Sequence, residues 1–386
     1  MIRNISVGID IGTSTTRIVV GEFLKGEKNP KVIGIGESET KGVRHGYITN
    51  ANETIASLKI AIDMAEKTSG IKIKRAFISL SSTTLRSEIS NGSVVISKAD
   101  GEVTNLDIEK VQEDCEKNLN LGNKKIIHAF PLSFKLDGKD ILGRPEGMRG
   151  TKIEGKTLFI TSSYQHWEDL LEVVTEAGVD PIGVVASPIA GSYIALSEKQ
   201  KIVGCGLIDI GSETISLSVF EDGKIISLQT FSIGSADITN DIALVLRIPL
   251  EKAETLKIEN PSDVSKKKLA EIIDARLSDI FELIENHLKK IKRNELLPAG
   301  IIFIGGGANT IGLEELSRTS LKLPSKIGTT EMFGNTKTKL RDQAWFVALG
   351  LLISKDNNET IIKGTLLNFF EDAKNAIKSS FKQLMP

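Results

Sequence analysis

The chain has 386 residues, of which 40% are hydrophobic and 26% are charged, with 49 basic and 50 acidic side chains. A chain of this length is too long for one ordinary core, so we expect two or three domains. The balanced charge excludes a protein that coats nucleic acid, and two widely separated cysteines, Cys115 and Cys205, exclude a disulfide framework and a zinc knuckle. The longest apolar stretch, residues 344–353, is about half of the roughly 20 residues that cross a bilayer, so we expect neither a secreted nor a transmembrane chain.

The first part of the chain predicts a β-meander followed by one helix. Apolar and β-branched runs separated by glycine-containing turns indicate strands at residues 5–11, 17–22 and 31–37. Apolar residues then recur at three- and four-residue spacing, which predicts a helix capped by Asn52 and ended by Gly70, before a strand at residues 75–81. From about Thr83 to Ser162 the pattern changes to short strands around one helix at residues 105–119, which we interpret as an inserted α+β module.

Helices and strands alternate again after this insert. The expected helices lie at residues 167–177, 190–197, 233–246, 266–291 and 312–319, and the expected strands at residues 203–210 and 300–304. The long helix at residues 266–291 has one apolar stripe and a face rich in lysine and glutamate. This pattern is typical of a helix that packs on a core with its other side in solvent.

One short sequence occurs twice, and it is the strongest organisational feature. Residues 7–15 read Val-Gly-Ile-Asp-Ile-Gly-Thr-Ser-Thr, and residues 206–214 read Gly-Leu-Ile-Asp-Ile-Gly-Ser-Glu-Thr, each followed by a second apolar run. The offset between Asp10 and Asp209 is 209 − 10 = 199 residues, about half of the chain. Solenoid repeats have periods of about 20 to 50 residues, so this longer period indicates a duplicated α/β domain and two similar lobes.

Each copy ends an apolar strand with aspartate and continues with glycine and hydroxyl residues in a turn. Such a turn presents N–H groups and hydroxyls to an anion, since glycine allows the backbone to approach closely. A carboxylate beside phosphate is repelled unless a cation lies between them, so Asp10 and Asp209 predict Mg²⁺, held through water. One such turn alone is more often structural, but its recurrence favours a clamp on one phosphate chain. The predicted phosphate-binding residues are Gly12, Thr13, Ser14, Thr15, Gly211, Ser212, Glu213 and Thr214.

A third element follows the apolar run at residues 301–304. Gly305, Gly306 and Gly307 form a loop without side chains, against which a planar base and a sugar could pack. The alternative is a tight connection between a strand and a helix, and the three glycines alone do not decide between the two.

These three elements, in this order and spacing, resemble the ATPase superfamily of actin, sugar kinases and heat-shock chaperones, and within it the FtsA family of bacterial cell-division proteins. Segments 8–22 and 207–219 are similar to the superfamily's two phosphate loops, 234–241 to its connecting segment and 301–308 to its adenosine motif. Stretches similar to more FtsA-specific sequence are 41–50, 128–131, 147–150 and 239–243. The resemblance implies an α/β fold with two actin-like lobes, built from duplicated ribonuclease-H-like domains, and an inserted small α+β subdomain of the SHS2 type.

The resemblance also implies domain limits and cofactors. The first lobe would comprise residues 1–82, 163–200 and 340–353, the inserted subdomain 83–162 and the second lobe 201–339. A linker at 354–365 and an amphipathic membrane-targeting helix at 366–386 would follow. ATP and Mg²⁺ are the implied cofactors, and the implied adenosine-binding residues are Gly234, Lys257, Gly305, Gly306, Gly307 and Ala308. For Lys257 the alternative is an ordinary surface lysine.

Two departures from the family pattern bear on catalysis. Ser212 and Glu213 replace glycines of the second loop, where Glu213 would repel phosphate, and Thr15 stands where relatives often have lysine. No residue is identified as a base that orients an attacking water, so we assign no catalytic residue. We therefore expect hydrolysis to be slow or absent, with ATP acting as a structural or switch ligand.

The end of the chain predicts an amphipathic helix after a short polar linker. From Leu366 onward, apolar residues recur at three- and four-residue spacing, beside lysines that recur every four residues. Residues 363–386 carry four lysines against Glu371 and Asp372, a net charge of +2, which suits an anionic membrane surface. The alternative is a helix docked on its own lobe. The predicted membrane-contacting residues are Phe369, Phe370, Ile377, Phe381, Leu384, Lys374, Lys378 and Lys382.

By this resemblance, the chain would be an ATP-binding adaptor on the cytoplasmic face of the cell membrane at the division site. It would polymerise like actin, tether the tubulin-like protein FtsZ to the inner membrane at the septum, and contact other division proteins but no nucleic acid. Arg276, on the predicted helix at 266–291, is the candidate contact for the FtsZ carboxy-terminal tail, unless it is a solvated arginine. The alternatives are a pilus-assembly protein like PilM, which gives no reason for the phenylalanine-bearing tail, and a small-molecule kinase, whose catalytic aspartate is not evident.

Overall fold

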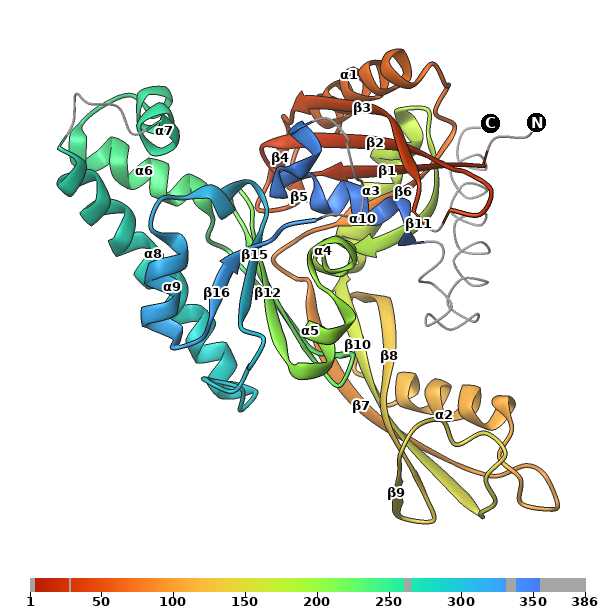
Figure 1. Ribbon diagram of the computed structural model, residues 1–386. Coiled ribbons are helices and arrows are strands. Elements are labelled where there is room, and N and C mark those ends of the chain that lie inside the picture. Colours follow the sequence, from red (N-terminus) through yellow and green to blue (C-terminus); the bar gives the residue numbers. More distant parts are fainter. Residues whose placement is uncertain (1–3, 28, 260–264, 331–337, 355–386) are drawn as a thin grey trace. The chain divides into compact units, whose positions relative to one another are not determined.

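The computed structural model describes residues 4–27, 29–259, 265–330 and 338–354 (Figure 1). These residues form two compact units. The first, which we call the core unit, comprises Met1–Ser87, Asn123–Lys125 and Ile160–Ile353, and the second, the insert unit, contains Glu88–Gly122 and Ile126–Phe159. The chain from residue 355 onward, which includes the predicted membrane-targeting helix at 366–386, lies outside the described residues.

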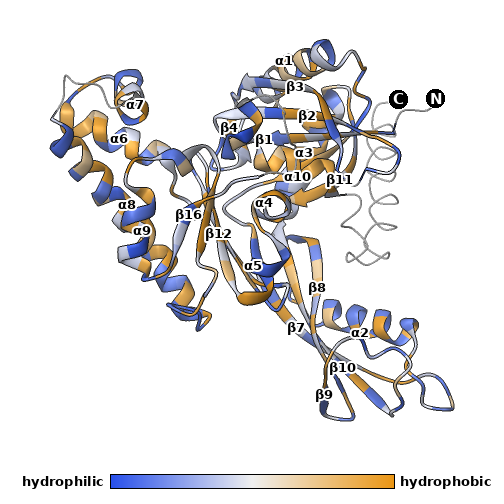
Figure 2. Ribbon diagram, viewed as in Figure 1, coloured by the Kyte–Doolittle hydropathy of each residue, from blue (hydrophilic) through white to orange (hydrophobic). Residues whose placement is uncertain are grey.

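The first lobe of the core unit is built on a five-stranded sheet. Its strands are β1 (Asn4–Ile11), β2 (Thr15–Phe23), β3 (Lys31–Glu39), β6 (Arg75–Leu80) and β11 (Asp180–Ala186), in the order β11-β6-β1-β2-β3. The strands β1, β2 and β3 form an antiparallel meander, and β6 and β11 continue the sheet as parallel strands beside β1. Three helices pack against this sheet: α1 (Ala51–Ser69), α3 (Tyr164–Glu176) and α10 (Phe346–Leu352). Figure 2 shows the hydrophobic character of its central strands.

The second lobe repeats this topology. Its strands are β12 (Cys205–Ile210), β13 (Ile215–Glu221), β14 (Lys224–Phe231), β15 (Ile301–Ile304) and β16 (Ser325–Ile327), in the order β16-β15-β12-β13-β14. Again an antiparallel meander is continued by two parallel strands. Its helices are α6 (Ser235–Leu246), α7 (Leu250–Glu259), α8 (Lys266–Lys290) and α9 (Leu313–Leu321). The duplicated lobes that the repeated sequence predicts are therefore confirmed.

Helix α8 supplies much of the second lobe's core. Its apolar stripe is buried against the sheet and neighbouring helices, through Leu269, Ile272, Ile273, Leu277, Ile280, Phe281, Ile284 and Leu288. Each fully buried side chain of this kind contributes about 1.5–3 kcal/mol relative to an exposed one. The helix ends only one residue before the predicted limit, since its regular apolar period runs through most of its length.

A short helix, α4 (Ser187–Ala195), joins the two lobes. It contacts strands of both core sheets, including β6, β11, β12 and β15, and it packs on α10. The contact with α10 requires glycine, since a Cβ atom on Gly350 would lie 1.9 Å from the Ala190 carbonyl oxygen. The close approach of these two helices fixes the carboxyl ends of β1 and β12 on one scaffold.

The insert unit is a small α+β structure, as predicted. It contains β9 (Lys139–Ile141) and most of β7 (Arg86–Val95), β8 (Lys124–Leu136) and β10 (Lys152–Ser163), in the order β7-β10-β8-β9, with α2 (Asn105–Lys117) packed on one face. The side chains of Thr104 and Asp107 form a reciprocal capping box at the start of α2. The strands are not short, however, since β8 and β10 have 13 and 12 residues.

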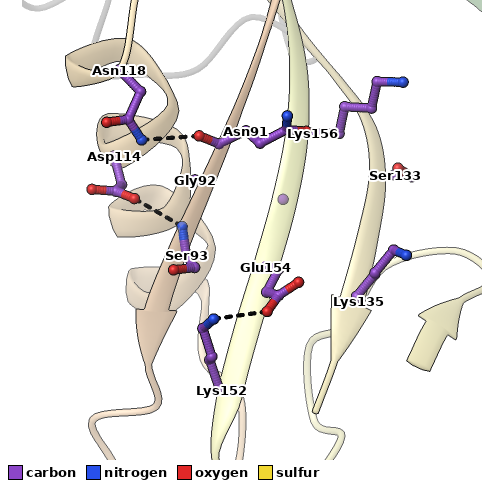
Figure 3. A pocket seen from close by; sticks show the side chains of 11 residues that line it. Asn91, Gly92, Ser93, Asp114, Asn118, Ser133, Lys135, Lys152, Glu154 and Lys156 are labelled. Atoms are coloured by element: carbon purple, nitrogen blue, oxygen red, sulfur yellow. Dashed lines mark hydrogen bonds and ion pairs between the residues drawn. The ribbon is translucent and has the colours of Figure 1, made fainter. Parts of the chain in front are cut away.

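A polar pocket of the insert unit is lined by residues of α2 and of the strands β7, β8 and β10 (Figure 3). The Ser93 N–H donates to Asp114 Oδ2 at 2.8 Å, and the Asn118 amide donates to the Asn91 carbonyl oxygen at 3.0 Å. These side chains occupy backbone groups of β7 that another strand would otherwise pair with. The two hydrogen bonds therefore tie α2 to β7, and we assign no ligand to the pocket.

Several predicted boundaries are wrong. Asn50, not Asn52, caps α1, because its side chain accepts a hydrogen bond from the Glu53 N–H at 3.3 Å. Helix α3 begins at Tyr164 rather than Trp167, without a side-chain cap that could mark its start in the sequence. Two helices, α4 and α5 (Glu198–Val203), replace the one predicted at residues 190–197. The small hairpin of β4 (Val43–Arg44) and β5 (Tyr47–Ile48) was not predicted, because its strands are too short to show a period.

Candidate functional site

The two repeated turns have the same backbone structure. The Gly12 N–H donates to the Thr15 carbonyl oxygen at 3.2 Å, and the Gly211 N–H donates to the Thr214 carbonyl oxygen at 2.9 Å. A Cβ atom on Gly12 or Gly211 would lie 2.8 Å or 2.9 Å from these same oxygens, so neither position has room for a side chain. The repeat in sequence is thus a repeat in conformation.

Asp10 and Asp209, at the ends of β1 and β12, are brought into electrostatic contact. Burial and, second, the charge of Asp10 raise the pKa of Asp209 to about 7. Burial also raises the pKa of Asp10, although Ser79 on β6 opposes the rise by donating to Asp10 Oδ1 at 2.6 Å. Both side chains stay partly accessible, so a water molecule or a cation can reach them. Two carboxylates 199 residues apart in sequence therefore share one site.

This pair of carboxylates fits a divalent cation. Mg²⁺ prefers carboxylate oxygens and water as ligands, and its charge would offset the repulsion that raises the pKa of Asp209. In residues 4–27, 29–259, 265–330 and 338–354, no group of three or more His, Cys, Asp or Glu side chains could hold a metal ion. A cation here would need water or a bound ligand to complete its coordination.

Arg17 is a cation of this site that the sequence analysis missed. It lies opposite Asp10 in the register of β1 and β2, and its charge opposes the rise in the pKa of both Asp10 and Asp209. Its Nε atom lies 3.3 Å from Glu37 Oε1, and its guanidinium lies 5.7 Å from the Trp345 ring centroid. Relatives often have lysine at the position of Thr15. Side chains two residues apart on a strand lie on the same face, so Arg17 can supply the positive charge that Thr15 lacks.

Glycines of two segments, before α6 and after β15, meet at the end of β12. A Cβ atom on Gly305 would lie 2.3 Å from Asp209 Oδ1, one on Gly307 would lie 2.3 Å from Ile210 Cγ2, and one on Gly234 would lie 2.2 Å from the Ser212 carbonyl oxygen. Gly306 differs, because no atom lies within 4 Å of its ideal Cβ position. The predicted adenosine residues Gly234 and Gly305–Ala308 thus surround the second turn, and Gly306 faces open space.

Lys257 is a buried residue, so the surface-lysine alternative is wrong. Its side chain is 8% exposed and forms an ion pair with Glu254 Oε2 at 2.7 Å. Its Nζ atom donates to the Ser235 carbonyl oxygen at 3.2 Å and to Thr239 Oγ1 at 2.8 Å. These bonds tie α7 to the start of α6, next to Gly234.

The remaining predicted site residues lie apart from this group or outside the described residues. Arg276 on α8 is held by Asp241 of α6, with its Nε and Nη2 atoms 2.7 Å and 3.0 Å from the two carboxylate oxygens, and its Nη1 atom lies 3.3 Å from Asp279. The predicted membrane-contacting residues, from Phe369 to Leu384, lie outside the described residues. Among the helices that are described, none combines the length and the apolar character needed to span a bilayer.

Comparison with known proteins matches the sequence to cell-division proteins. The family model described as "Cell division protein FtsA" matches residues 206–350, and the model of the SHS2 domain inserted in FtsA matches residues 83–161. The chain is 28% identical over 370 residues to the FtsA of Pseudomonas aeruginosa, covering 90% of this chain and 88% of the relative. It is 30% identical over 375 residues to the FtsA of Neisseria meningitidis serogroup B, covering 91% and 89%.

Solved structures share the two-lobed actin-like fold. A chain of a PilM-PilN type IV pilus biogenesis complex superposes with a TM-score of 0.68 at 18% identity, covering 90% of this chain and 98% of that one. MreB5 of Spiroplasma citri bound to ADP superposes with a TM-score of 0.52 at 14% identity, covering 92% and 96%. At these identities the likeness concerns the fold alone, so the family follows from the sequence relatives. With 30% identity to one relative over most of both chains and with matches to both family models, this chain belongs to the FtsA family of cell-division proteins.

Proposed function

We propose that this chain is an ATP-binding adaptor that polymerises on the inner membrane at the division site and tethers FtsZ to it. The single observation that carries the nucleotide part is the electrostatic interaction between Asp10 and Asp209, each at the end of a strand that leads into a turn with the same closing hydrogen bond. Membership of the FtsA family supports the role in cell division.

In this proposal, both turns bind one polyphosphate. The N–H groups and hydroxyls of residues 12–15 and 211–214 contact its oxygens, and Asp10 and Asp209 hold Mg²⁺ through water. Bound magnesium would neutralise charge on the phosphates and on the two carboxylates together. The adenosine packs against residues 305–308, where Gly306 faces open space. That MreB5 binds ADP on the same fold supports a nucleotide here.

Slow or absent hydrolysis follows from the second turn. An attacking water needs a base or an orienting side chain with a free acceptor. Glu213 is the acidic side chain of this turn, and its carboxylate already accepts the His45 N–H at 2.7 Å and pairs with Arg44 at 2.8 Å. The bound nucleotide therefore serves as a switch that joins the two lobes.

The membrane part of the proposal rests on the sequence pattern of residues 366–386. Three phenylalanines alternate with lysines at helical spacing, and residues 363–386 have a net charge of +2. Cations near an anionic membrane contribute roughly 1 kcal/mol each, and buried aromatic side chains add to this attraction. The segment would place the adaptor on the cytoplasmic face of the inner membrane.

The surface around Arg276 has the chemistry to dock the tail of FtsZ. Arg276 is 29% exposed although it pairs with Asp241, so its guanidinium can bind an acidic peptide as well. One turn after Asp241 on α6, the apolar side chains of Leu244 and Val245 are 78% and 48% exposed. A cation beside two apolar contacts suits a short peptide that carries acidic and hydrophobic residues.

Flotation on vesicles of phosphatidylethanolamine and phosphatidylglycerol tests the proposed membrane contact and the proposed FtsZ contact in one experiment. The full chain with MgATP should float and carry a labelled FtsZ tail peptide with it. A chain ending at Ile362 should stay in solution, and R276E should float without the peptide, because its reversed charge repels acidic residues. R318E, which reverses another helix arginine of the second lobe, is the matched control. A truncated chain that still floats contradicts the membrane proposal, and peptide carried by R276E contradicts the docking surface.

The fold likeness to the PilM-PilN complex favours a second candidate, a pilus-assembly protein that binds nucleotide on the same scaffold. This candidate gives no role to the phenylalanines and lysines after Leu366. It predicts that the full chain and the truncated chain behave alike in the flotation assay, so the same experiment separates the two functions.

A further inference from the structure

The β4–β5 hairpin of the first lobe touches both turns of the candidate site. The Gly46 N–H donates to Thr13 Oγ1 at 3.3 Å in the first turn, and the His45 N–H donates to Glu213 Oε2 at 2.7 Å in the second. The His45 Nδ1 atom also lies 3.2 Å from the Glu213 carbonyl oxygen. A two-residue tip therefore bridges turns that belong to different lobes.

The tip of this hairpin is held in a defined position. His45 and Gly46 have φ angles of 49° and 79°, the left-handed pair that a tight two-residue hairpin requires. A Cβ atom on Gly46 would lie 2.5 Å from the Ser81 carbonyl oxygen, so the tip packs directly on the chain after β6. The next residue, Tyr47, stacks edge-on against His166 with ring centroids 5.2 Å apart. The neighbouring side chain of Arg44 thus starts from a fixed backbone.

Arg44 and Glu213 form an ion pair across the two lobes. The Arg44 Nε atom lies 2.8 Å from Glu213 Oε1, and the two side chains are 67% and 16% exposed. Glu213 follows Ser212 in a turn that presents N–H groups, where an unpaired carboxylate would repel an anion. The pair offsets this repulsion through Nε, and the exposed guanidinium keeps terminal N–H groups that can donate to an anion.

We propose that Arg44 is a polyphosphate-binding residue that Glu213 holds in position. The inference rests on the proposed nucleotide site and assigns one more residue to it. The guanidinium presents several N–H donors in a plane that suits phosphate oxygens. Arg44 thereby adds a second cation to the site besides Arg17, and it offsets the carboxylate of Glu213, one of the two departures from the family pattern.

Calorimetric titration with Mg²⁺ and ATP, ADP or adenosine tests the role of Arg44 by direct binding. R44Q should weaken ATP binding about tenfold, ADP binding less, and adenosine binding not at all, because the lost charge faces only phosphate. The effect should shrink in high salt. R75Q is the matched control, since Arg75 is an exposed arginine of the same lobe at the opposite end of β6 from Ser79. Thermal melting of each ligand-free variant reports any loss of folding.

A double-mutant cycle separates phosphate binding from simple pairing with Glu213. If Arg44 binds phosphate, adding R44Q to an E213Q chain should still weaken ATP binding several-fold. If Arg44 only neutralises Glu213, the E213Q and R44Q/E213Q chains should bind ATP equally, and the inference is overturned. A wild-type chain that binds neither ATP nor ADP overturns the proposed nucleotide site and this inference with it, whereas tight wild-type binding that R44Q leaves unchanged overturns the inference alone.

Discussion

Replacing Asp209 with asparagine is expected to stabilise the ligand-free protein at pH 8 while it weakens the binding of MgATP. In the wild-type chain, burial and the charge of Asp10 raise the pKa of Asp209 from 3.8 to about 7. Between these values the folded state holds more protons than the unfolded state, so stability falls as the pH rises from about 4 to about 7. Asparagine removes this loss because it never ionises, and a rise of this size in the pKa corresponds to a gain above pH 7 on the order of 4 kcal/mol.

Urea unfolding in EDTA at pH 5 and pH 8 measures this effect. The difference in stability between D209N and the wild-type chain should be larger at pH 8 than at pH 5. D222N, at an exposed turn of the same lobe, is the control for replacing an aspartate by asparagine. The same D209N chain should bind MgATP less tightly than the wild-type chain, since one carboxylate of the proposed magnesium site is gone. A D209N chain that is less stable at both pH values, or binds MgATP normally, would contradict the account.

Replacing Gly305 with alanine should disrupt the second lobe, whereas the same change at Gly306 should leave its stability unchanged. Gly305 has a φ angle of 87°, and its Cβ atom would lie 2.3 Å from Asp209 Oδ1 and 2.5 Å from the Ile210 carbonyl oxygen. Backbone strain and the displacement of these atoms together cost about 3 kcal/mol or more. Gly306 has no atom within 4 Å of its Cβ position, so G306A adds a methyl group in open space.

The two glycine variants also test where adenosine packs. Thermal melting should show a melting temperature several degrees lower for G305A and an unchanged value for G306A. Nucleotide titration should nevertheless show weaker binding by G306A, because its methyl group enters the space proposed for the adenosine. Equal melting temperatures for the two variants would contradict the packing around Asp209. Unchanged nucleotide binding by G306A would remove Gly306 from the adenosine site.

The parts of the fold that the sequence predicts well are those with a strong period or a repeat. The apolar stripe of α8 locates this helix to within one residue, and the repeated strand-turn segments around Asp10 and Asp209 predict two lobes of the same topology. Helix starts are predicted less well where no polar side chain caps the helix, as at Tyr164. A hydrophobic period identifies the buried face of an element but does not mark its first residue.

The candidate site is predictable only where its residues are adjacent in sequence. Glycines and aspartates at the ends of strands are visible as sequence motifs. Arg17, in contrast, reaches the site through the register of β1 and β2. Arg44 reaches it through its ion pair with Glu213, which is 213 − 44 = 169 residues away in the sequence. The sequence does not show that Lys257 is buried, because its hydrogen-bond partners, Ser235 and Thr239, belong to another helix. Long-range pairing of charged groups depends on tertiary packing, which no local pattern contains.

The central claim is that the two repeated turns, at residues 12–15 and 211–214, bind one magnesium nucleotide between Asp10 and Asp209. A crystal structure of the full chain with Mn²⁺ and a non-hydrolysable ATP analogue tests it most directly, because manganese replaces magnesium and can be located by its anomalous signal. The account predicts one manganese peak beside both carboxylates, with phosphate density touching the turns at Gly12 and Gly211. A nucleotide that contacts only one turn, or a manganese ion bound away from both aspartates, would contradict it.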